Sequence, residues 1–182
     1  MKELSLHVYD LLENSIAAKA TKVELTIKDS KKENIYAFTI KDNGKGMSPE
    51  FLAKVTDPWT TTRTTRKVGL GLPLIKMNTE NAGGGMKIES TVGVGTKLDF
   101  WFQHEHLDRA PMGDIAGTIV MLCQNYEDIH FIYTHITDEG EYVFDTDEIK
   151  EALDGMSMRD LSIIKFLKDM IKENLNEIGY SD

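Results

Sequence analysis

Glycine-rich segments are the feature of this sequence that most restricts its fold. They lie at residues 44–46, 69–71, 83–85 and 93–95, and each borders a stretch with helical or strand periodicity. Glycine ends helices and adopts the positive φ angles of tight turns, so these segments set the ends of the elements between them. Residues 1–102 are therefore expected to form short elements in the order α, β, β, α, α, β, β.

Apolar periodicity predicts the individual elements of this first part. Apolar residues recur at helical spacing over residues 3–19, which predicts an amphipathic helix. Alternating apolar residues at 23–28 and 35–41 predict two strands that form a hairpin. Ser48 and Pro49 predict the start of a short helix, because serine caps helices and proline suits the first helical position. The further predictions are an exposed loop at 56–68, a helix at 72–81 and strands at 86–90 and 96–102.

The distribution of charge divides the chain after Phe102. Of the 21 basic and 30 acidic residues, 15 basic and 12 acidic ones lie in residues 1–102. The difference leaves 6 basic and 18 acidic residues for 103–182, and this shift predicts a module boundary. A strongly acidic second part disfavours nucleic acid as a partner, whereas the slightly basic first part suits a small anionic ligand. The alternative is that the two surfaces are merely solvated differently.

The second part is expected to be a small acidic α/β module. An apolar run predicts a helix at 113–124, and two β-rich runs at 129–136 and 141–144 predict a hairpin. Ser157 and Asp160 resemble a capping pair for a long final helix. We expect the apolar stripe of this helix to pack on its own module rather than on a partner. The stripe consists of Leu161, Ile164, Leu167, Ile171, Leu175 and Ile178.

The composition is that of a soluble globular protein, with 41% hydrophobic and 28% charged residues. The longest apolar stretch, residues 115–123, is far shorter than the roughly 20 residues of a membrane helix. Glu3 and Asp10 argue against a signal peptide at the start. We therefore expect a cytoplasmic protein without a membrane partner. The single cysteine, Cys123, lies in an apolar run and is expected to be a small buried apolar residue.

The segment Asp42-Asn43-Gly44-Lys45-Gly46-Met47 follows a predicted strand. Taken alone it is typical of a turn, because Asp-Asn-Gly sequences favour positive φ angles. It is also suited to binding a base, since glycines let the backbone approach a flat ring and a carboxylate accepts a hydrogen bond from an exocyclic amino group. Adenine has such an amino group where guanine has an oxygen, so the functional interpretation favours adenine.

The segment Gly69-Leu70-Gly71-Leu72-Pro73 lies between a basic loop and a predicted helix. Its backbone N–H groups and the helix N-terminus could converge on an anion such as a phosphate. Arg63, Arg66 and Lys67 would add positive charge, although threonine- and arginine-rich loops are often simply solvated. The segment is neither the phosphate loop of the common NTPases nor a dinucleotide fingerprint, so another part of the chain must hold the metal.

Asp10 and Asn14 are four residues apart and are neighbours on the surface of the first predicted helix. An amide oxygen and a carboxylate at this spacing could meet a phosphate-bound Mg2+ and an attacking nucleophile. A solvated helix face would have the same pattern, so both interpretations stay open.

Four motifs, in this order, resemble the GHKL (Bergerat-fold) ATPase superfamily and its HATPase_c domain. They are the helix that carries Asn14, the segments at 42–47 and 69–72, and Gly93-Val94-Gly95-Thr96. The match spans about residues 4–102. It implies an α+β fold, a two-layer sandwich with a mixed sheet, that binds ATP and Mg2+.

The resemblance also implies roles for individual residues. Carried over to this sequence, it makes Asn14 the Mg2+ ligand and Asp42 the residue that reads the adenine, and it places Thr96 near the base. The other nucleotide contacts that it implies are Gly44, Gly46 and Met47 at the base, and Gly69, Leu70, Gly71 and Leu72 in a movable lid over the phosphates.

Two branches of the superfamily share features with this chain. Asp57-Pro58-Trp59-Thr60-Thr61 and the two later glycine motifs look most like the catalytic domain of sensor histidine kinases. The helix around Asn14 is more similar to the mismatch-repair ATPases, except that Ala17 replaces an aspartate usual there. Asp10 stands where many members have a glutamate general base. Its shorter side chain predicts slow activation of water.

Histidines are considered because a histidine kinase needs a phosphoacceptor. The chain begins at the Asn14 helix, so we expect the phosphoacceptor to lie elsewhere. His7 shares a helix face with Asp10 and is expected to be a partly exposed side chain without a catalytic role. His104 and His106 project from one strand end without a third ligand, so we expect no transition metal.

The leading functional hypothesis is an ATP-dependent protein kinase of the histidine-kinase type that acts on a separate protein. The first alternative is an ATP-driven switch with slow turnover, in which closure of the lid changes how the acidic module holds a partner. The second is an interaction protein that keeps the fold without turnover. The partner would be a separate protein or a second copy of the chain, and residues 103–182 are where we expect it to bind.

Overall fold

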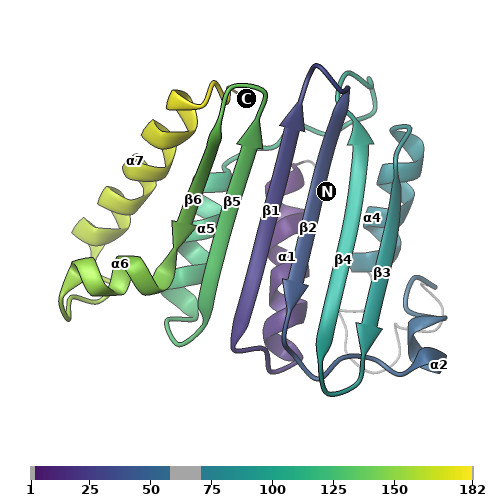
Figure 1. Cartoon of the computed structure of the whole chain (residues 1–182), viewed down its shortest axis with the longest axis horizontal. Coiled ribbons are helices and arrows are strands. Elements are labelled where there is room, and N and C mark those ends of the chain that lie inside the picture. Colours follow the sequence, from purple (N-terminus) through teal and green to yellow (C-terminus); the bar gives the residue numbers. More distant parts are fainter. Residues whose placement is uncertain (1–2, 58–70, 182) are drawn as a thin grey trace.

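The computed structural model of the protein describes residues 3–57 and 71–181. An open six-stranded sheet carries helices on one of its faces (Figure 1). The strands are β1 (Lys22–Ser30), β2 (Ile35–Asp42), β3 (Gly85–Thr91), β4 (Gly95–Gln103), β5 (His130–Thr137) and β6 (Glu141–Asp145). The helices are α1 (Leu4–Ala17), α2 (Pro49–Leu52), α4 (Gly71–Asn81), α5 (Ile115–Asn125), α6 (Thr146–Leu153) and α7 (Leu161–Glu177).

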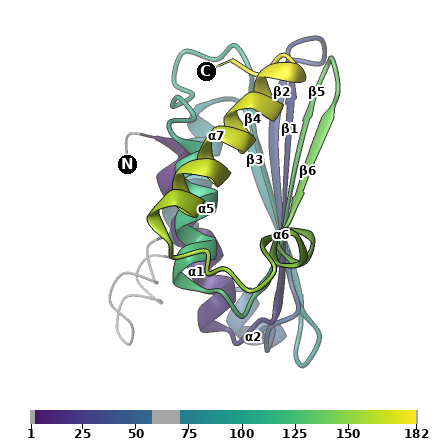
Figure 2. The same cartoon turned by 90° about the vertical axis from the view of Figure 1, so that its left-hand side faces the viewer.

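The strands lie in the order β3-β4-β2-β1-β5-β6. Neighbouring strands are antiparallel except β1 and β5, which are parallel. Figure 2, in which the sheet is seen edge-on, shows α1, α5 and α7 together on one side of it. The structure is therefore a two-layer α+β sandwich with a mixed sheet, which confirms the predicted fold class.

Alternation along the strands determines which face of the sheet the helices cover. In β1 the side chains of Val23, Leu25 and Ile27 are fully buried, whereas those between them are not. Successive residues of a strand point to opposite faces, so these three face the helices. Phe38 of β2 and Phe100 of β4 stack in the same core, with ring centroids 4.7 Å apart. The hydrophobic core thus lies between the sheet and the helix layer.

The second half of the chain extends the same sheet. β5 runs parallel to β1, with Lys22 opposite His130. The predicted hairpin of β5 and β6 is confirmed. α5 packs against both α1 and α7, and Leu167 in the apolar stripe of α7 is buried, so the predicted packing of this helix within the chain is also confirmed. Leu161 departs from the prediction, because it lies where the helix begins and is 83% exposed.

Two capping residues explain how the C-terminal helices begin. α6 is absent from the sequence prediction because Asp145 has the appearance of a strand end. The Asp145 carboxylate accepts a hydrogen bond from the N–H of Asp147, so Asp145 is the N-cap of α6. Asp160 caps α7 as predicted. Ser157 does not cap α7, because its hydroxyl oxygen accepts a hydrogen bond from the N–H of Arg159, which lies before the helix begins. The same hydroxyl donates to the carboxylate of Glu127.

The apolar run at residues 115–123 forms most of the buried helix α5. Within the described residues, neither α5 nor another helix is long and apolar enough to cross a membrane. Cys123 is 2% exposed, and burial raises the pKa of its thiol to about 12. The thiol therefore stays protonated at neutral pH and behaves as the expected small apolar group.

Two of the glycine-rich turns lie where backbones come close together. Gly46 has a φ of +71°, and a Cβ atom there would lie 2.1 Å from the carbonyl oxygen of Thr91. Gly95 has a φ of +143°, and a Cβ atom there would lie 2.0 Å from the carbonyl oxygen of Asp42. A side chain at either position would collide with the backbone. The loop after β2 therefore packs directly against the turn between β3 and β4.

Replacement of Gly46 by alanine is expected to destabilise the fold more than the same replacement at Gly93. Both residues have a positive φ, which costs alanine about 1–2 kcal/mol. Only at Gly46 would the new methyl group also meet Thr91, since no described atom lies within 4 Å of a Cβ at Gly93. Urea unfolding of both variants measures the difference. Equal stability of the two variants would contradict this close approach.

The imidazole of His135 predicts a pH dependence of stability. It is fully buried beside the hydroxyl of Tyr133, and burial lowers its pKa from 6.5 to about 4. Because the unfolded chain takes up this proton first, the free energy of unfolding is expected to fall as the pH drops from 6.5 towards 4. In urea unfolding, His135→Gln is expected to lose about 1–2 kcal/mol less than wild type between pH 7 and pH 5. An unchanged pH dependence would show the prediction to be wrong.

Candidate functional site

The carboxylate of Asp42 lies at the end of β2, next to the helix layer. Its Oδ2 atom accepts a hydrogen bond from the Ser15 hydroxyl of α1 at 2.7 Å, and its Oδ1 atom accepts one from the N–H of Gly44 at 2.9 Å. Ser15 is buried, whereas Asp42 is only partly buried. The two donors fix the orientation of the carboxylate, and its other lone pairs remain available to a ligand.

Asn43 fastens the loop after β2 to the loop before β1. Its Oδ1 atom accepts hydrogen bonds from the backbone N–H groups of Thr21 and Lys22, at 2.8 and 2.9 Å. Its Nδ2 atom donates to the Thr21 hydroxyl at 2.9 Å. The sequence indicates only a turn at this position. The structure shows that Asn43 holds the segment around Asp42 in place.

Thr96 lies beside Asp42 on the neighbouring strand β4, at the same register position. Its hydroxyl is 2.8 Å from that of Ser90, which also accepts a hydrogen bond from the N–H of Met47 at 2.8 Å. Asp42 and Thr96 continue the buried series of their strands, so their side chains lie on the face that the helices cover. Met47 and Thr96, which belong to two separate motifs, are thus joined through Ser90, which no motif indicates.

Asn14 and Gly71 are neighbours where α1 meets the start of α4. A Cβ atom on Gly71 would lie 3.8 Å from Asn14 Nδ2. Gly71 is the first residue of α4, so the N-terminal end of this helix lies beside the Asn14 side chain. Asp10 is exposed one turn earlier in α1, and Leu72 is partly buried against the core. The fold therefore brings the first and third motifs together.

Five residues of the predicted phosphate side lie outside the described part of the chain. They are Arg63, Arg66, Lys67, Gly69 and Leu70. Most of the predicted loop at 56–68 also lies outside it. Their contacts with a nucleotide remain predictions from the motif.

His7 is buried, which corrects the expectation of a partly exposed side chain. It is 2% exposed, and its Nε2 atom lies 3.1 Å from the amide nitrogen of Asn78 in α4. Burial lowers the pKa of the imidazole to about 4. The neutral ring can accept a hydrogen bond from Asn78 and so link the two helices. The expectation was wrong because α4 covers this part of α1, and helical periodicity alone does not show such packing.

His104 and His106 have separate partners. His104 is 6% exposed, and its Nε2 atom lies 2.5 Å from Oδ1 of Asp29. Its ring also packs against Tyr36, with centroids 5.4 Å apart. His106 lies in the following turn, where its Nδ1 atom accepts a hydrogen bond from the N–H of Asp108. Each imidazole is thus used in local structure.

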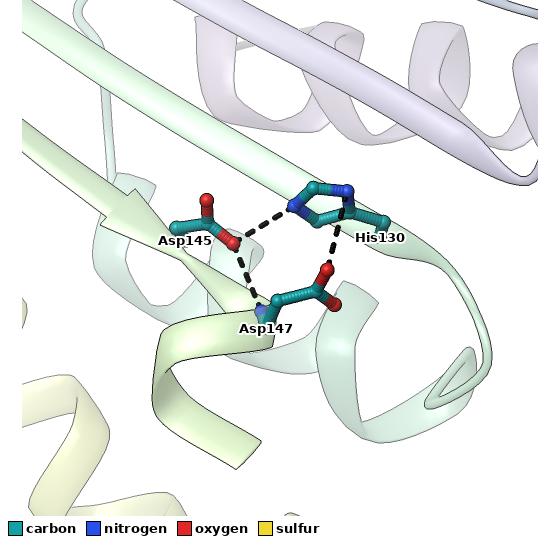
Figure 3. Close-up of side chains that lie close together, drawn as sticks. All are labelled: His130, Asp145 and Asp147. Carbon is teal, nitrogen blue, oxygen red and sulfur yellow. Dashed lines mark hydrogen bonds and ion pairs between the residues drawn. The ribbon is translucent and has the colours of Figure 1, made fainter. Parts of the chain in front are cut away.

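A further group of ionisable side chains lies at the start of α6 (Figure 3). His130 Nε2 is 2.9 Å from Asp145 Oδ1, and His130 Nδ1 is 3.5 Å from Asp147 Oδ2. The two carboxylates therefore face different nitrogens of one ring. One ligand atom from each of the three residues lies within 4.8 Å of the others, a spacing that a cation would also accept, although exposed acidic groups are common without one. We interpret the arrangement as structural, because Asp145 caps α6 and His130 contacts both carboxylates at the start of that helix.

Curated proteins similar to this chain include sensor proteins. The chain is 33% identical over 103 residues to a protein of Shewanella frigidimarina (strain NCIMB 400) that is named as a sensor protein. The aligned region covers 56% of this chain and 16% of that protein. It is 28% identical over 101 residues to the sensor histidine kinase ZraS of Salmonella typhimurium, which covers 56% of this chain and 21% of that protein. The chain therefore spans less than a quarter of the length of these relatives.

The fold is similar to that of the N-terminal domain of a DNA repair protein. The TM-score is 0.59 at 17% identity, over 87% of this chain and 55% of that chain. Residues 2–106, more than half of the chain, match the model of a protein family. The chain belongs to the family of histidine kinase-, DNA gyrase B- and HSP90-like ATPases.

Proposed function

We propose that the chain binds Mg-ATP between α1, α4 and the ends of β2 and β4, with Asp42 as the acceptor for adenine. The fixed carboxylate of Asp42 carries this proposal, and membership of the ATPase family supports ATP as the nucleotide. The adenine amino group would donate to a carboxylate oxygen, whereas guanine would oppose it with another acceptor. Gly44, Gly46, Met47 and Thr96 would border the base.

Mg2+ would be held by the amide oxygen of Asn14, because Mg2+ prefers oxygen ligands and is bound together with phosphates. Gly71 fits this role for Asn14, since the absence of a Cβ leaves space beside the amide for a phosphate. The N-terminal end of α4 would add N–H donors and the positive end of the helix dipole. The further phosphate contacts that we propose are Arg63, Arg66, Lys67, Gly69, Leu70 and Leu72.

The proposed use of the bound ATP is phosphoryl transfer to a separate protein, as in histidine kinases. A relative named as a sensor histidine kinase supports this reaction type. His7 is buried and lies beside Asn78, which supports an acceptor other than this histidine. Asp10, exposed one turn before Asn14, is shorter than a glutamate, so hydrolysis by water is expected to be slow.

An ATP-driven switch is the second candidate function. In this case residues 103–182 would hold a partner protein or a second copy of the chain. The pairing of β5 with β1 and the packing of α5 on α1 favour it, because a displacement of α1 by nucleotide would reach these elements. An interaction protein without turnover is the remaining alternative.

Asp42→Asn is expected to weaken ATP binding by about 10- to 100-fold, because the charged acceptor for the adenine amino group is lost. Calorimetric titration measures this effect, and wild type is expected to bind ATP more tightly with Mg2+ and to ignore GTP. Asp99→Asn is the matched control, since the Asp99 carboxylate accepts a hydrogen bond from the Thr39 hydroxyl on the other face of the sheet. Failure of folded wild type to bind ATP would overturn the proposal.

Asn14→Ala is expected to remove the Mg2+-dependent part of ATP binding and to keep the Mg2+-free part. Labelled γ-phosphate then distinguishes the two uses of ATP. A kinase transfers the label to a protein, and Asn14→Ala is expected to abolish the transfer. A switch shows nucleotide-dependent association without a labelled protein. Mg-ATP affinity unchanged in Asn14→Ala would rule out this residue as the metal ligand.

A further inference from the structure

We infer that the C-terminal half of the chain positions the proposed nucleotide helix α1 through four side chains. This group, called the α1–α5 latch, consists of Tyr9 and Glu13 in α1 with Asn125 and Tyr126 at the end of α5. The inference rests on the proposed function, because it takes Asn14 of α1 as the metal ligand. The family match ends at residue 106. The inference therefore assigns residues beyond that match a role in positioning the proposed site.

Two hydrogen bonds form the latch. The Tyr126 hydroxyl donates to Glu13 Oε1 at 3.0 Å, and the amide nitrogen of Asn125 donates to the Tyr9 hydroxyl at 3.0 Å. Burial raises the pKa of both phenols, and the Glu13 carboxylate also raises both. Each hydroxyl therefore keeps its proton at neutral pH, and Tyr126 remains a donor to Glu13.

The latch lies on the side of α1 next to the proposed metal site. Tyr9 and Glu13 are four residues apart and lie one above the other on the helix. Asp10 follows Tyr9, and Asn14 follows Glu13. Each is therefore turned by about 100° around the helix axis from the residue before it. A rotation of α1 would move both pairs together. By resisting this rotation, the latch would keep Asn14 beside Gly71.

Backbone contacts from the C-terminal half hold the start of α1 as well. The N–H groups of Leu4 and Ser5 donate to the carbonyl oxygens of Pro111 and Met112, at 2.9 and 2.8 Å. Apolar burial also anchors α1, and these hydrogen bonds add directional contacts to that packing. Contacts at the start of α1 and in its middle thus come from residues beyond 106.

Glu127, the next residue after the latch, connects it to the remaining C-terminal elements. Its carbonyl oxygen accepts a hydrogen bond from the Lys150 ammonium of α6. Its carboxylate accepts one from the Ser157 hydroxyl at 3.2 Å and pairs with Arg159 Nε at 3.0 Å. Residues 125–127 therefore receive contacts from α1 on one side and from α6 and the loop before α7 on the other. A partner bound to these elements would act on α1.

Tyr126→Phe removes the hydroxyl, keeps the ring, and tests the inference. We expect Mg-ATP affinity to fall about three- to tenfold, as for one lost hydrogen bond of ordinary strength, and Mg2+-free affinity to change less than about twofold. Calorimetric titration of the whole chain measures both. Tyr142→Phe is the matched control, because this tyrosine is also partly buried but lies on β6 at the far edge of the sheet. It is expected to bind as wild type does.

A double-mutant cycle and a thermal melt separate positioning from stability. Glu13→Gln combined with Tyr126→Phe is expected to weaken Mg-ATP binding little more than one substitution does, because both break the same contact. A structural role alone would lower the melting temperature while leaving the affinity of the folded protein unchanged. Wild-type Mg-ATP affinity in folded Tyr126→Phe would overturn the inference.

Hydrogen exchange distinguishes failure of the latch from failure of the proposed function. If wild type does not bind ATP, the amides of α1 are still expected to exchange faster in Tyr126→Phe than in wild type or Tyr142→Phe. Unchanged exchange in α1 would overturn the latch, whether or not the protein binds ATP.

Discussion

The hydrogen bond between Ser15 and Asp42 joins the helix layer to the sheet, and the proposed site depends on it. A carboxylate that is partly removed from water needs donors, and here they come from α1 and from the turn after β2. Close approach of these elements is possible because Gly44 has no side chain: a Cβ there would lie 2.8 Å from the carbonyl oxygen of Ala18. The orientation of the carboxylate is thus a property of the whole fold.

Local sequence patterns predict most of the elements, but not how the two halves of the chain meet. Turn signals and period-2 alternation predict the hairpins of β1 with β2 and of β5 with β6, because these signals act over a few residues. The parallel pairing of β1 with β5 joins Lys22 to His130, and no periodicity encodes a contact between segments so far apart. α6 is missed for a different reason. Its first turn depends on Asp145, whose capping role appears only when the strand before it is in place.

The sequence predicts the candidate site where a motif carries its own geometry, as around Asp42, and misses the residues that support it. Ser15 and Ser90 gain their partners only from the tertiary arrangement, because a serine hydroxyl can serve many local roles. The alternation of side chains along β3 and β4, together with the pairing of these two strands, could have placed Ser90 beside Thr96. His7 shows the opposite error, since it was expected to be partly exposed and is covered by α4.

The contacts of α1 couple the proposed site to the rest of the molecule, whichever reaction follows binding. His7 lies against α4, Ser15 bonds to the Asp42 carboxylate of the sheet, and Glu13 accepts a hydrogen bond from the end of α5. A helix held on three sides cannot shift at one contact without a response at the others. A kinase needs this rigidity to keep metal and phosphate in place, and a switch needs it to transmit closure. The groups near the γ-phosphate, and not the fold, therefore decide between the two.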